Sequence, residues 1–281
     1  MRRFGGSFLR VGRFYHFFMN LWGQNPCFKL SFTPYYLMNR QLTLKIGDHL
    51  GSADKKKYFN EEMFSIIAPR YDFITRLFSF WQDASWKRDL IADLPEKISP
   101  ACLDLACGTG DMAFLLAEKY PKGEIIGLDL TEDMLQLARQ RSRYPNLRFV
   151  KGDMGQLDIA PETIDVITGG YALRNAPDLA QTVVEIYRVL KPGGIAAFLD
   201  FSKPKTAWAQ KLEYYILKGW TGLWGILLNG NHEVYSYIAE SLNAFPNRQE
   251  LKRMFEQQGF SILISRLHFL GITETLIVQK K

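Results

Sequence analysis

Short runs of hydrophobic residues alternate with segments of helical spacing over most of the chain. Apolar runs of roughly four to eight residues are typical of strands buried on both faces, and they lie at 101–106, 124–130, 147–150, 164–168 and 195–201. Helical spacing lies between them, at 112–119, 131–138 and 179–190. Strands that alternate with helices indicate a parallel sheet covered on both faces, which is an α/β fold.

The end of the chain departs from this alternation. A helical pattern at 248–257 precedes two apolar runs, 261–267 and 273–279, whose short connection favours antiparallel pairing. The full pattern predicts a Rossmann-like, doubly wound sheet of about seven strands, mostly parallel, with an antiparallel C-terminal strand. Segment 203–245 is rich in Trp, Tyr, Leu and Gly and predicts a helical insertion over an apolar substrate pocket; a plain packing subdomain is the alternative.

A glycine turn follows the first predicted strand. The strand carries Asp104 and runs into Gly108-Thr109-Gly110, where glycines let the backbone approach a ligand closely. The turn lacks the full G-x-G-x-x-G spacing of a dinucleotide site, and Asp111, directly after it, would repel a pyrophosphate. A cationic ligand such as S-adenosylmethionine tolerates that carboxylate, so the turn favours this cofactor.

Two further strands end in carboxylates. Asp129, followed by Leu130, lies about 20 residues beyond the glycine turn, where a carboxylate can accept both hydroxyls of a ribose. Asp153 ends the third strand, placed to bond an adenine amino group, with Met154 beside it for ring packing. Each Asp taken alone would be read as a helix cap or a solvated loop residue. Together, carboxylates at consecutive strand ends predict a site for S-adenosylmethionine.

Several segments carry a family resemblance. Three segments resemble the class I S-adenosylmethionine-dependent methyltransferases: 103–111, 127–130 and 187–194. Five others are similar to the C-methyltransferases of ubiquinone and menaquinone biosynthesis: 69–72, 86–88, 173–175, 200–204 and 235–246. The resemblance covers roughly 55–281, which we interpret as one methyltransferase domain. It implies that Gly170, at the fourth strand end where the family commonly has a serine, belongs to the cofactor site. The family's usual Asn is replaced by Thr75 in the segment that begins at Tyr71.

The resemblance also implies a reaction, the C-methylation of a prenylated quinol. Demethylmenaquinol is favoured; a benzoquinol precursor of ubiquinone and another small aromatic or lipid metabolite stay open. Arg174, just past the fourth strand, is expected to stabilise the oxyanion of the deprotonated quinol, and a structural pair with Asp178 or Glu185 is the alternative. Tyr71 and Asp72 are candidates to complete a proton path, with packing as the alternative for Tyr71. The sequence offers no ligand set for a metal.

The net charge of +6 has an uneven origin. Residues 1–47 contain seven Lys or Arg and no acidic residue, and removing these seven leaves 28 basic against 29 acidic residues. A nucleic-acid binder should instead carry its basic residues on a face of the folded domain, so nucleic acid is not an expected partner.

The first part of the chain is also aromatic, with 11 of the 39 aromatic residues before position 48. We expect 1–54 to be a poorly structured extension, with Met38 as one candidate for the true start. A transit peptide to an organelle, although Ser is scarce, and an anchor at a membrane surface are the alternatives. The scattered three Cys and four His favour a reducing, cytoplasmic location, peripheral to a membrane in the anchor interpretation. No run approaches the roughly 20 apolar residues of a membrane-spanning helix.

Overall fold

The computed structural model describes residues 52–229 and 233–281, so the expected extension at 1–54 lies almost wholly outside the described residues. The described chain forms a seven-stranded sheet in the order β3-β2-β1-β4-β5-β7-β6. Its strands are β1 (Ala101–Leu105), β2 (Glu124–Asp129), β3 (Leu147–Lys151), β4 (Ile164–Gly170), β5 (Leu190–Phe201), β6 (Phe260–His268) and β7 (Thr273–Lys280). The first five are parallel, while β7 runs antiparallel to both β5 and β6. The predicted α/β fold with antiparallel C-terminal strands is confirmed.

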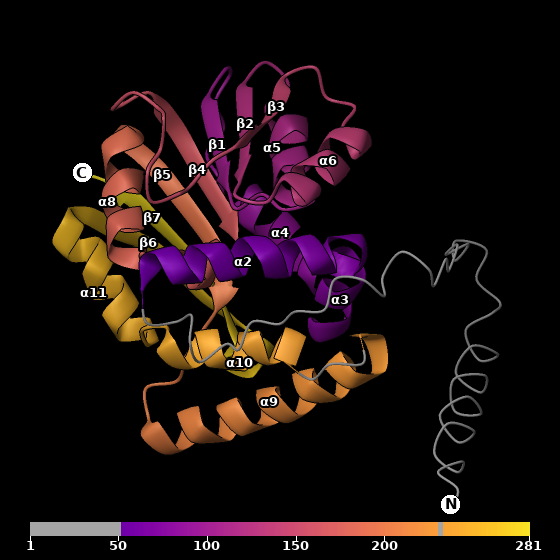
Figure 1. The fold of residues 1–281 in the computed structure, drawn as a ribbon. Helices are drawn as coiled ribbons and strands as arrows, with labels where there is room; N and C mark the ends of the chain where they lie inside the picture. Colours follow the sequence, from indigo (N-terminus) through magenta and orange to yellow (C-terminus); the bar gives the residue numbers. More distant parts are fainter. Residues whose placement is uncertain (1–51, 230–232) are drawn as a thin grey trace, which may run out of the picture. The chain divides into compact units, whose positions relative to one another are not determined.

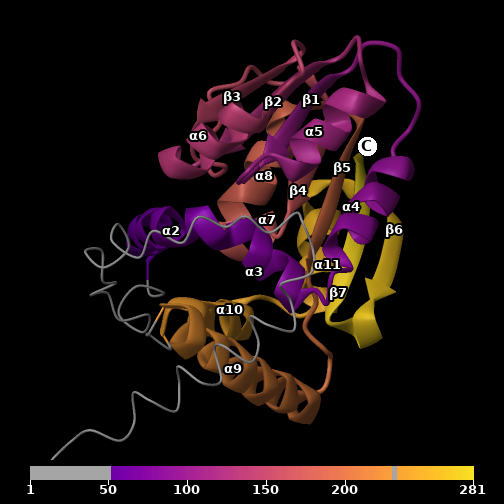
Figure 2. The same cartoon turned by 90° about the vertical axis from the view of Figure 1, so that its right-hand side faces the viewer.

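Helices cover both faces of the sheet (Figures 1 and 2). The covering helices are α4 (Asp83–Ala92), α5 (Asp111–Lys119), α6 (Glu132–Arg141), α8 (Leu179–Val189) and α11 (Arg248–Gln258). Successive side chains of a strand point to opposite faces, and β1 shows the result. Leu103 and Leu105 belong to the hydrophobic core that includes α8 and α11, whereas Cys102 belongs to the core that includes α4 and α5. Two apolar cores therefore hold β1 rigidly between them.

The segment 191–194 differs from its prediction. The sequence was expected to leave a turn there, between a helix and a strand that begins at Ile195. Instead α8 ends at Val189 and β5 begins at once, with Leu190 paired to Ile164. The register then shifts before Ile195 pairs with Val166, and Gly193 has a φ of +73°. The Pro-Gly-Gly sequence ends the helix, as expected, but forms a bulge within the strand rather than a loop.

Four helices lie beyond the carboxyl ends of the parallel strands (Figures 1 and 2). They are α2 (Ala53–Ile67), α3 (Tyr71–Phe78), α9 (Ala207–Asn229) and α10 (Glu233–Ala244). The Ser52 side chain caps α2 by accepting a bond from the backbone N–H of Lys55, so this helix begins slightly before the expected domain boundary at 55. The insertion at 203–245 supplies α9 and α10, and α10 lies between α9 and the strand ends. Within the described ranges no helix is both long and apolar enough to span a bilayer.

Candidate functional site

A cavity opens where the strand order reverses, beside the carboxyl ends of β1 and β4. Ligands of open α/β sheets bind at this position. The cavity contains about 580 Å³ of empty space, part of it open to solvent. Two non-glycine residues on its wall, Ala106 after β1 and Tyr171 after β4, have left-handed backbones with φ of +48° and +58°. Such strained residues persist where the surrounding structure enforces them, often at functional sites.

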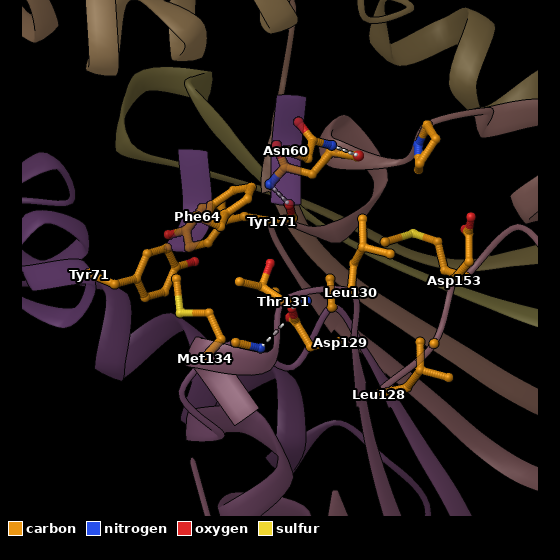
Figure 3. Close-up of a pocket in the computed structure, with 17 residues that line it drawn as sticks. Asn60, Phe64, Tyr71, Leu128, Asp129, Leu130, Thr131, Met134, Asp153 and Tyr171 are labelled. Carbon is orange, nitrogen blue, oxygen red and sulfur yellow. Dashed lines mark hydrogen bonds between the residues drawn. The ribbon is translucent and has the colours of Figure 1, made fainter. Parts of the chain in front are cut away.

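Asp129, at the end of β2, is the central polar group of this first cavity (Figure 3). Its side chain is buried, and its two oxygens accept bonds of 2.8 Å from the backbone N–H groups of Gly108 and Thr131. Burial raises the pKa of this carboxyl, although the two donated hydrogen bonds oppose the rise. Each carboxylate oxygen has two acceptor sites, so Asp129 keeps capacity for the hydroxyls of a bound ribose.

Asp153 lies beyond β3, on the side of the cavity away from Phe64 and Tyr71 (Figure 3). One carboxylate oxygen accepts a bond of 2.8 Å from the backbone N–H of Gly155. The other pairs at 2.9 Å with the Lys57 ammonium group of α2. Asp153 therefore holds the rim of the cavity to α2 as well as facing the cavity itself.

Besides the Lys57–Asp153 pair, helix α2 makes two more polar contacts beside the first cavity. The Lys56 ammonium group donates at 2.6 Å to the carbonyl of Ala176, and the Asn60 amide donates at 2.7 Å to the carbonyl of Asn175. Burial, together with the nearby Arg174, lowers the pKa of Lys56 to about 8. These bonds join α2 to the short helix α7 (Ala172–Asn175) that follows β4.

The structure brings six of the nine expected cofactor residues together on the wall of the first cavity: Gly108, Asp129, Leu130, Asp153, Met154 and Gly170. Asp104, Thr109 and Gly110 do not line it. Asp104 lies within β1, is 1% exposed, and accepts a bond of 2.7 Å from the hydroxyl of Thr168 in β4. Burial raises the pKa of Asp104 to about 7. One oxygen thus joins β1 to β4, while the other, Oδ2, is buried with no hydrogen-bond partner in the described chain.

Asp72 and Thr109 form a connection beside the cavity. The Thr109 hydroxyl donates at 2.6 Å to one oxygen of Asp72, and the Arg141 guanidinium pairs with the other at 2.9 Å. Arg141 also donates to the Thr109 carbonyl and pairs with Asp111 at 2.9 Å. Asp72 thus ties α3 to the glycine turn and lines neither of the cavities described here.

Asp111 does not stand as an isolated negative charge. It pairs with Arg141 and also, at 3.4 Å, with the buried ammonium group of Lys87. Burial would raise the pKa of Asp111, but Lys87 and Arg141 outweigh it and the net pKa is lowered. The two cations are shared, however: Lys87 also pairs with Asp83 at 2.8 Å and Arg141 with Asp72 at 2.9 Å, so two positive charges stand beside three carboxylates.

A second cavity adjoins the first and contains about 750 Å³ of empty space. The two share a wall of four residues: Phe64, Tyr71, Tyr171 and Asn175. The rest of its lining is largely apolar and aromatic, with contributions from Ile67, Phe78, Trp86, Phe201, Tyr237 and Phe269. Four buried polar atoms on its lining residues have no hydrogen-bond partner in the described chain: Arg174 Nε, Asn175 Oδ1, the Tyr237 hydroxyl and Thr273 Oγ1. Buried polar atoms normally have a partner, so these four are free to bond solvent or a ligand that enters the cavity.

Arg174 belongs to this second cavity. Its guanidinium donates to the Ser241 hydroxyl and lies over the rings of Phe201 and Tyr237, with centroids at 4.9 and 5.8 Å. The carboxylates considered as structural partners are engaged elsewhere, since Asp178 caps α8 and Glu185 pairs with Arg188. Arg174 is 5% exposed, which places a held cation at the wall of an aromatic cavity.

Tyr71 lines both cavities, between the cofactor side and the aromatic side. Burial raises the pKa of its hydroxyl to about 12. The phenol therefore stays protonated at neutral pH and is available as a hydrogen-bond donor rather than as a base.

Comparison with known proteins now identifies the family. The ubiE/COQ5 methyltransferase family model matches residues 51–278. The chain belongs to the ubiE/COQ5 methyltransferase family. It is an S-adenosylmethionine-dependent methyltransferase, and the predicted family, enzyme class and cofactor are confirmed.

Individual relatives agree with this assignment. The chain is 39% identical over 210 residues to the demethylmenaquinone methyltransferase of Thermus thermophilus, covering 74% of this chain and 95% of the relative. It is 36% identical over 227 residues to the 2-phytyl-1,4-naphtoquinone methyltransferase of Thermosynechococcus vestitus, covering 79% and 98%. The solved structure of an S-adenosylmethionine-dependent methyltransferase from Mesorhizobium loti shares the fold, with a TM-score of 0.52, 18% identity and coverage of 70% and 98%.

The first cavity fits the cofactor of this family. Gly108 lies on its wall with a φ of +53°, a left-handed backbone that a residue with a side chain would adopt only with strain. Asn60, on the wall of this cavity, has a buried Oδ1 that makes no well-formed hydrogen bond in the described chain, and its side chain also lies near the Tyr237 hydroxyl. Leu130 and Met154 supply apolar surface of the kind an adenine ring packs against.

Sequence reasoning missed several wall residues of the methyltransferase site. Asn60 and Phe64 lie on α2, about 40 positions before the glycine turn, and carry no local signal of a ligand site. Asn175 and Tyr237 lie inside segments that the family resemblance singled out, 173–175 and 235–246, so there a signal was present without an assigned role.

Proposed function

We propose that this enzyme methylates a ring carbon of a prenylated 1,4-naphthoquinol, with demethylmenaquinol as the substrate. The second cavity carries the proposal, because it joins a flat aromatic lining to unpartnered polar atoms beside the cofactor cavity. Relatives named for demethylmenaquinone and for 2-phytyl-1,4-naphtoquinone support a naphthoquinol over a benzoquinol.

The proposed reaction asks the protein to make a ring carbon nucleophilic. Bound S-adenosylmethionine supplies an activated methyl group. A quinol that loses a hydroxyl proton places electron density on the neighbouring ring carbon, and a fixed cation favours that phenolate. Arg174 meets this need, since the Ser241 hydroxyl and the rings of Phe201 and Tyr237 hold its guanidinium in place.

Other groups on the wall would orient the quinol. Burial raises the pKa of the Tyr237 hydroxyl to about 12, so it remains a donor at neutral pH. Thr273 Oγ1, from the start of β7, offers a second polar contact at the same cavity. A few polar positions in a largely apolar lining suit a ring that carries two hydroxyl groups and is apolar elsewhere.

The test uses purified enzyme, S-adenosylmethionine and two reduced substrates with the same short prenyl chain, a 2-prenyl-1,4-naphthoquinol and a 2-methoxy-6-prenyl-1,4-benzoquinol. We expect the naphthoquinol to gain one methyl on carbon, with a kcat/KM at least about 10-fold above that of the benzoquinol. The oxidised naphthoquinone is the control, because it has no hydroxyl to ionise and should not react. A preference for the benzoquinol would move the substrate to ubiquinone synthesis, and methylation of neither would contradict the proposal.

A further inference from the structure

Helix α9 exposes an apolar face to solvent. Its outward residues are Trp208, Leu212, Tyr215, Ile216 and Leu223, which are 70%, 53%, 68%, 60% and 50% exposed. Side chains at these spacings lie on one side of an α-helix. We call these five residues the α9 face. The opposite side is occupied, since Thr221 is buried and the Tyr214 hydroxyl donates to Glu240 of α10.

Positive charge flanks the α9 face. Lys205 and Lys211 are exposed, and Lys211 directly precedes Leu212 of the α9 face. Lys218 faces α10 instead, where its ammonium group pairs with Glu240 at 3.0 Å. The only acidic residue in the α9 sequence, Glu213, is half-buried. An apolar face bordered by lysines is typical of helices that lie in the interface of an anionic membrane.

The α9 face continues into the mouth of the second cavity. Trp220 of α9 stacks on Phe80 with ring centroids 6.0 Å apart, and Phe80 stacks on Phe269 at 5.0 Å. Phe269 lines the second cavity, and Phe80 and Phe269 are 50% and 40% exposed. Apolar surface therefore runs from the outer helix to the cavity that receives the substrate in the proposed function. Figures 1 and 2 show α9 as the layer furthest from the sheet.

We propose that the α9 face docks the enzyme on an anionic lipid surface, from which a prenylated substrate enters the second cavity. The charge of the α9 region favours a lipid surface over two other occupants, a second copy of the chain and residues 1–47. A second copy of the chain would bring the same lysines against each other, and like charges across an interface oppose association. Residues 1–47 carry seven basic and no acidic residues, so they too match α9 in sign. An anionic lipid surface complements both the lysines and the apolar side chains. The entry route rests on the proposed function, whereas the docking itself does not.

The test measures binding of the full chain to vesicles of phosphatidylglycerol and phosphatidylcholine, and to vesicles of phosphatidylcholine alone. Leu212→Glu combined with Ile216→Glu should weaken binding to the mixed vesicles by about 100-fold, because two inserted aliphatic side chains are replaced by charges. Lys211→Gln should weaken it about fivefold on the mixed vesicles and leave phosphatidylcholine binding unchanged. Brominated lipids should quench the tryptophan fluorescence of the wild type. This quenching should be smaller in Trp208→Phe, because that variant lacks the tryptophan of the α9 face.

A matched control changes two exposed aliphatic residues elsewhere, Ile98→Glu with Leu263→Glu, which are 82% and 48% exposed in the wild type. This control should bind vesicles like the wild type. We call the double change Leu212→Glu with Ile216→Glu the α9 variant. If this variant also binds vesicles like the wild type, another segment binds the lipid and the proposal is overturned. A dimer in solution that the α9 variant splits would equally overturn it, by showing that a second copy covers this face.

Turnover of a soluble short-chain naphthoquinol separates this inference from the proposed function. The α9 variant should keep that turnover and lose turnover of a long-chain quinol embedded in the mixed vesicles. Vesicle binding through α9 by a protein that methylates neither quinol would refute the proposed function and leave the docking intact.

Discussion

The two cavities share a wall but are built in opposite ways. The first consists of strand ends, a glycine turn and carboxylates whose oxygens are held by backbone N–H groups. The second consists largely of aromatic side chains from α2, α3, α4, α10, the end of β5 and the turn before β7, with a few polar atoms that lack partners. Backbone contacts shape the first cavity, which fits the cofactor, whereas side-chain packing shapes the second cavity, which we propose for the substrate. Substitutions should therefore separate cofactor binding from substrate chemistry, except at the shared wall.

The largest separation is expected at Arg174. Arg174→Ala should lower the single-turnover rate by about 100-fold or more while cofactor affinity, measured by calorimetry, stays near the wild type. Arg174→Lys keeps the positive charge but loses the planar guanidinium with its paired N–H donors. Its single-turnover rate should therefore fall between that of the wild type and that of Arg174→Ala. Arg266→Ala is the control, since that exposed arginine of β6 pairs with Asp93 and lines neither cavity. A loss below about threefold in Arg174→Ala would make the arginine structural.

The reverse separation is expected at Asp129. Asp129→Ala removes the acceptor for two backbone N–H groups and for the cofactor hydroxyls. Cofactor binding should weaken by about 1–3 kcal/mol, the typical effect of leaving buried polar groups unpartnered. Quinol affinity in the cofactor-saturated enzyme should change little. Unchanged cofactor affinity in calorimetry would remove Asp129 from the binding site.

A smaller, substrate-side effect is expected at Tyr237. Tyr237→Phe removes one hydroxyl and keeps the ring that packs beside Arg174. If the hydroxyl bonds the quinol, KM should rise by roughly 5- to 10-fold, in line with about 1 kcal/mol for one neutral hydrogen bond. Cofactor affinity should stay at the wild-type value. An equal loss of cofactor affinity would show that the two cavities are not separable at this position.

The smallest effect on either cavity is expected at Asp104, which lines neither. Its folded-state pKa of about 7 lies above the ordinary value of 3.8. The folded protein therefore holds the proton more strongly, and the stability that this group contributes is present below about pH 4 and is lost as pH rises towards 7. Asp104→Asn keeps the acceptor for the Thr168 hydroxyl. In denaturant titrations it should gain stability relative to the wild type between pH 4 and 7, and parallel profiles would contradict the raised pKa.

The same contrast explains what the sequence could predict. Asp129 and Asp153 follow strands, where side chains reach the carboxyl edge of the sheet, so their place in the chain was enough to predict their position. Asp104 lies inside β1, and its side chain points across the sheet to Thr168 instead. A period-two pattern marks a residue as inward-facing but does not state which neighbouring strand it meets.

The second cavity could not be assembled from local patterns. Its wall joins Met63 of α2 to Thr273 of β7, residues far apart in the chain, and their meeting depends on how α2 and α10 pack beyond the strand ends. The balance of charge around Asp111 was missed for the same reason, because Lys87 and Arg141 come from two other helices. The wall of the second cavity and the charges around Asp111 both depend on long-range packing and not on a local sequence motif.

Arg141 has a consequence for the timing of the catalytic cycle. It bonds helix α3 through Asp72 and the glycine turn through Thr109 and Asp111, and its side chain is 37% exposed. Salt screens partly exposed ion pairs of this kind, whereas it leaves the backbone bonds to Asp129 in place. Moderate ionic strength should therefore loosen the attachment of α3 to the glycine turn before it weakens the backbone bonds to Asp129. Where release of spent cofactor limits turnover, as lid opening does in many enzymes, added salt would first speed the cycle and only later slow it.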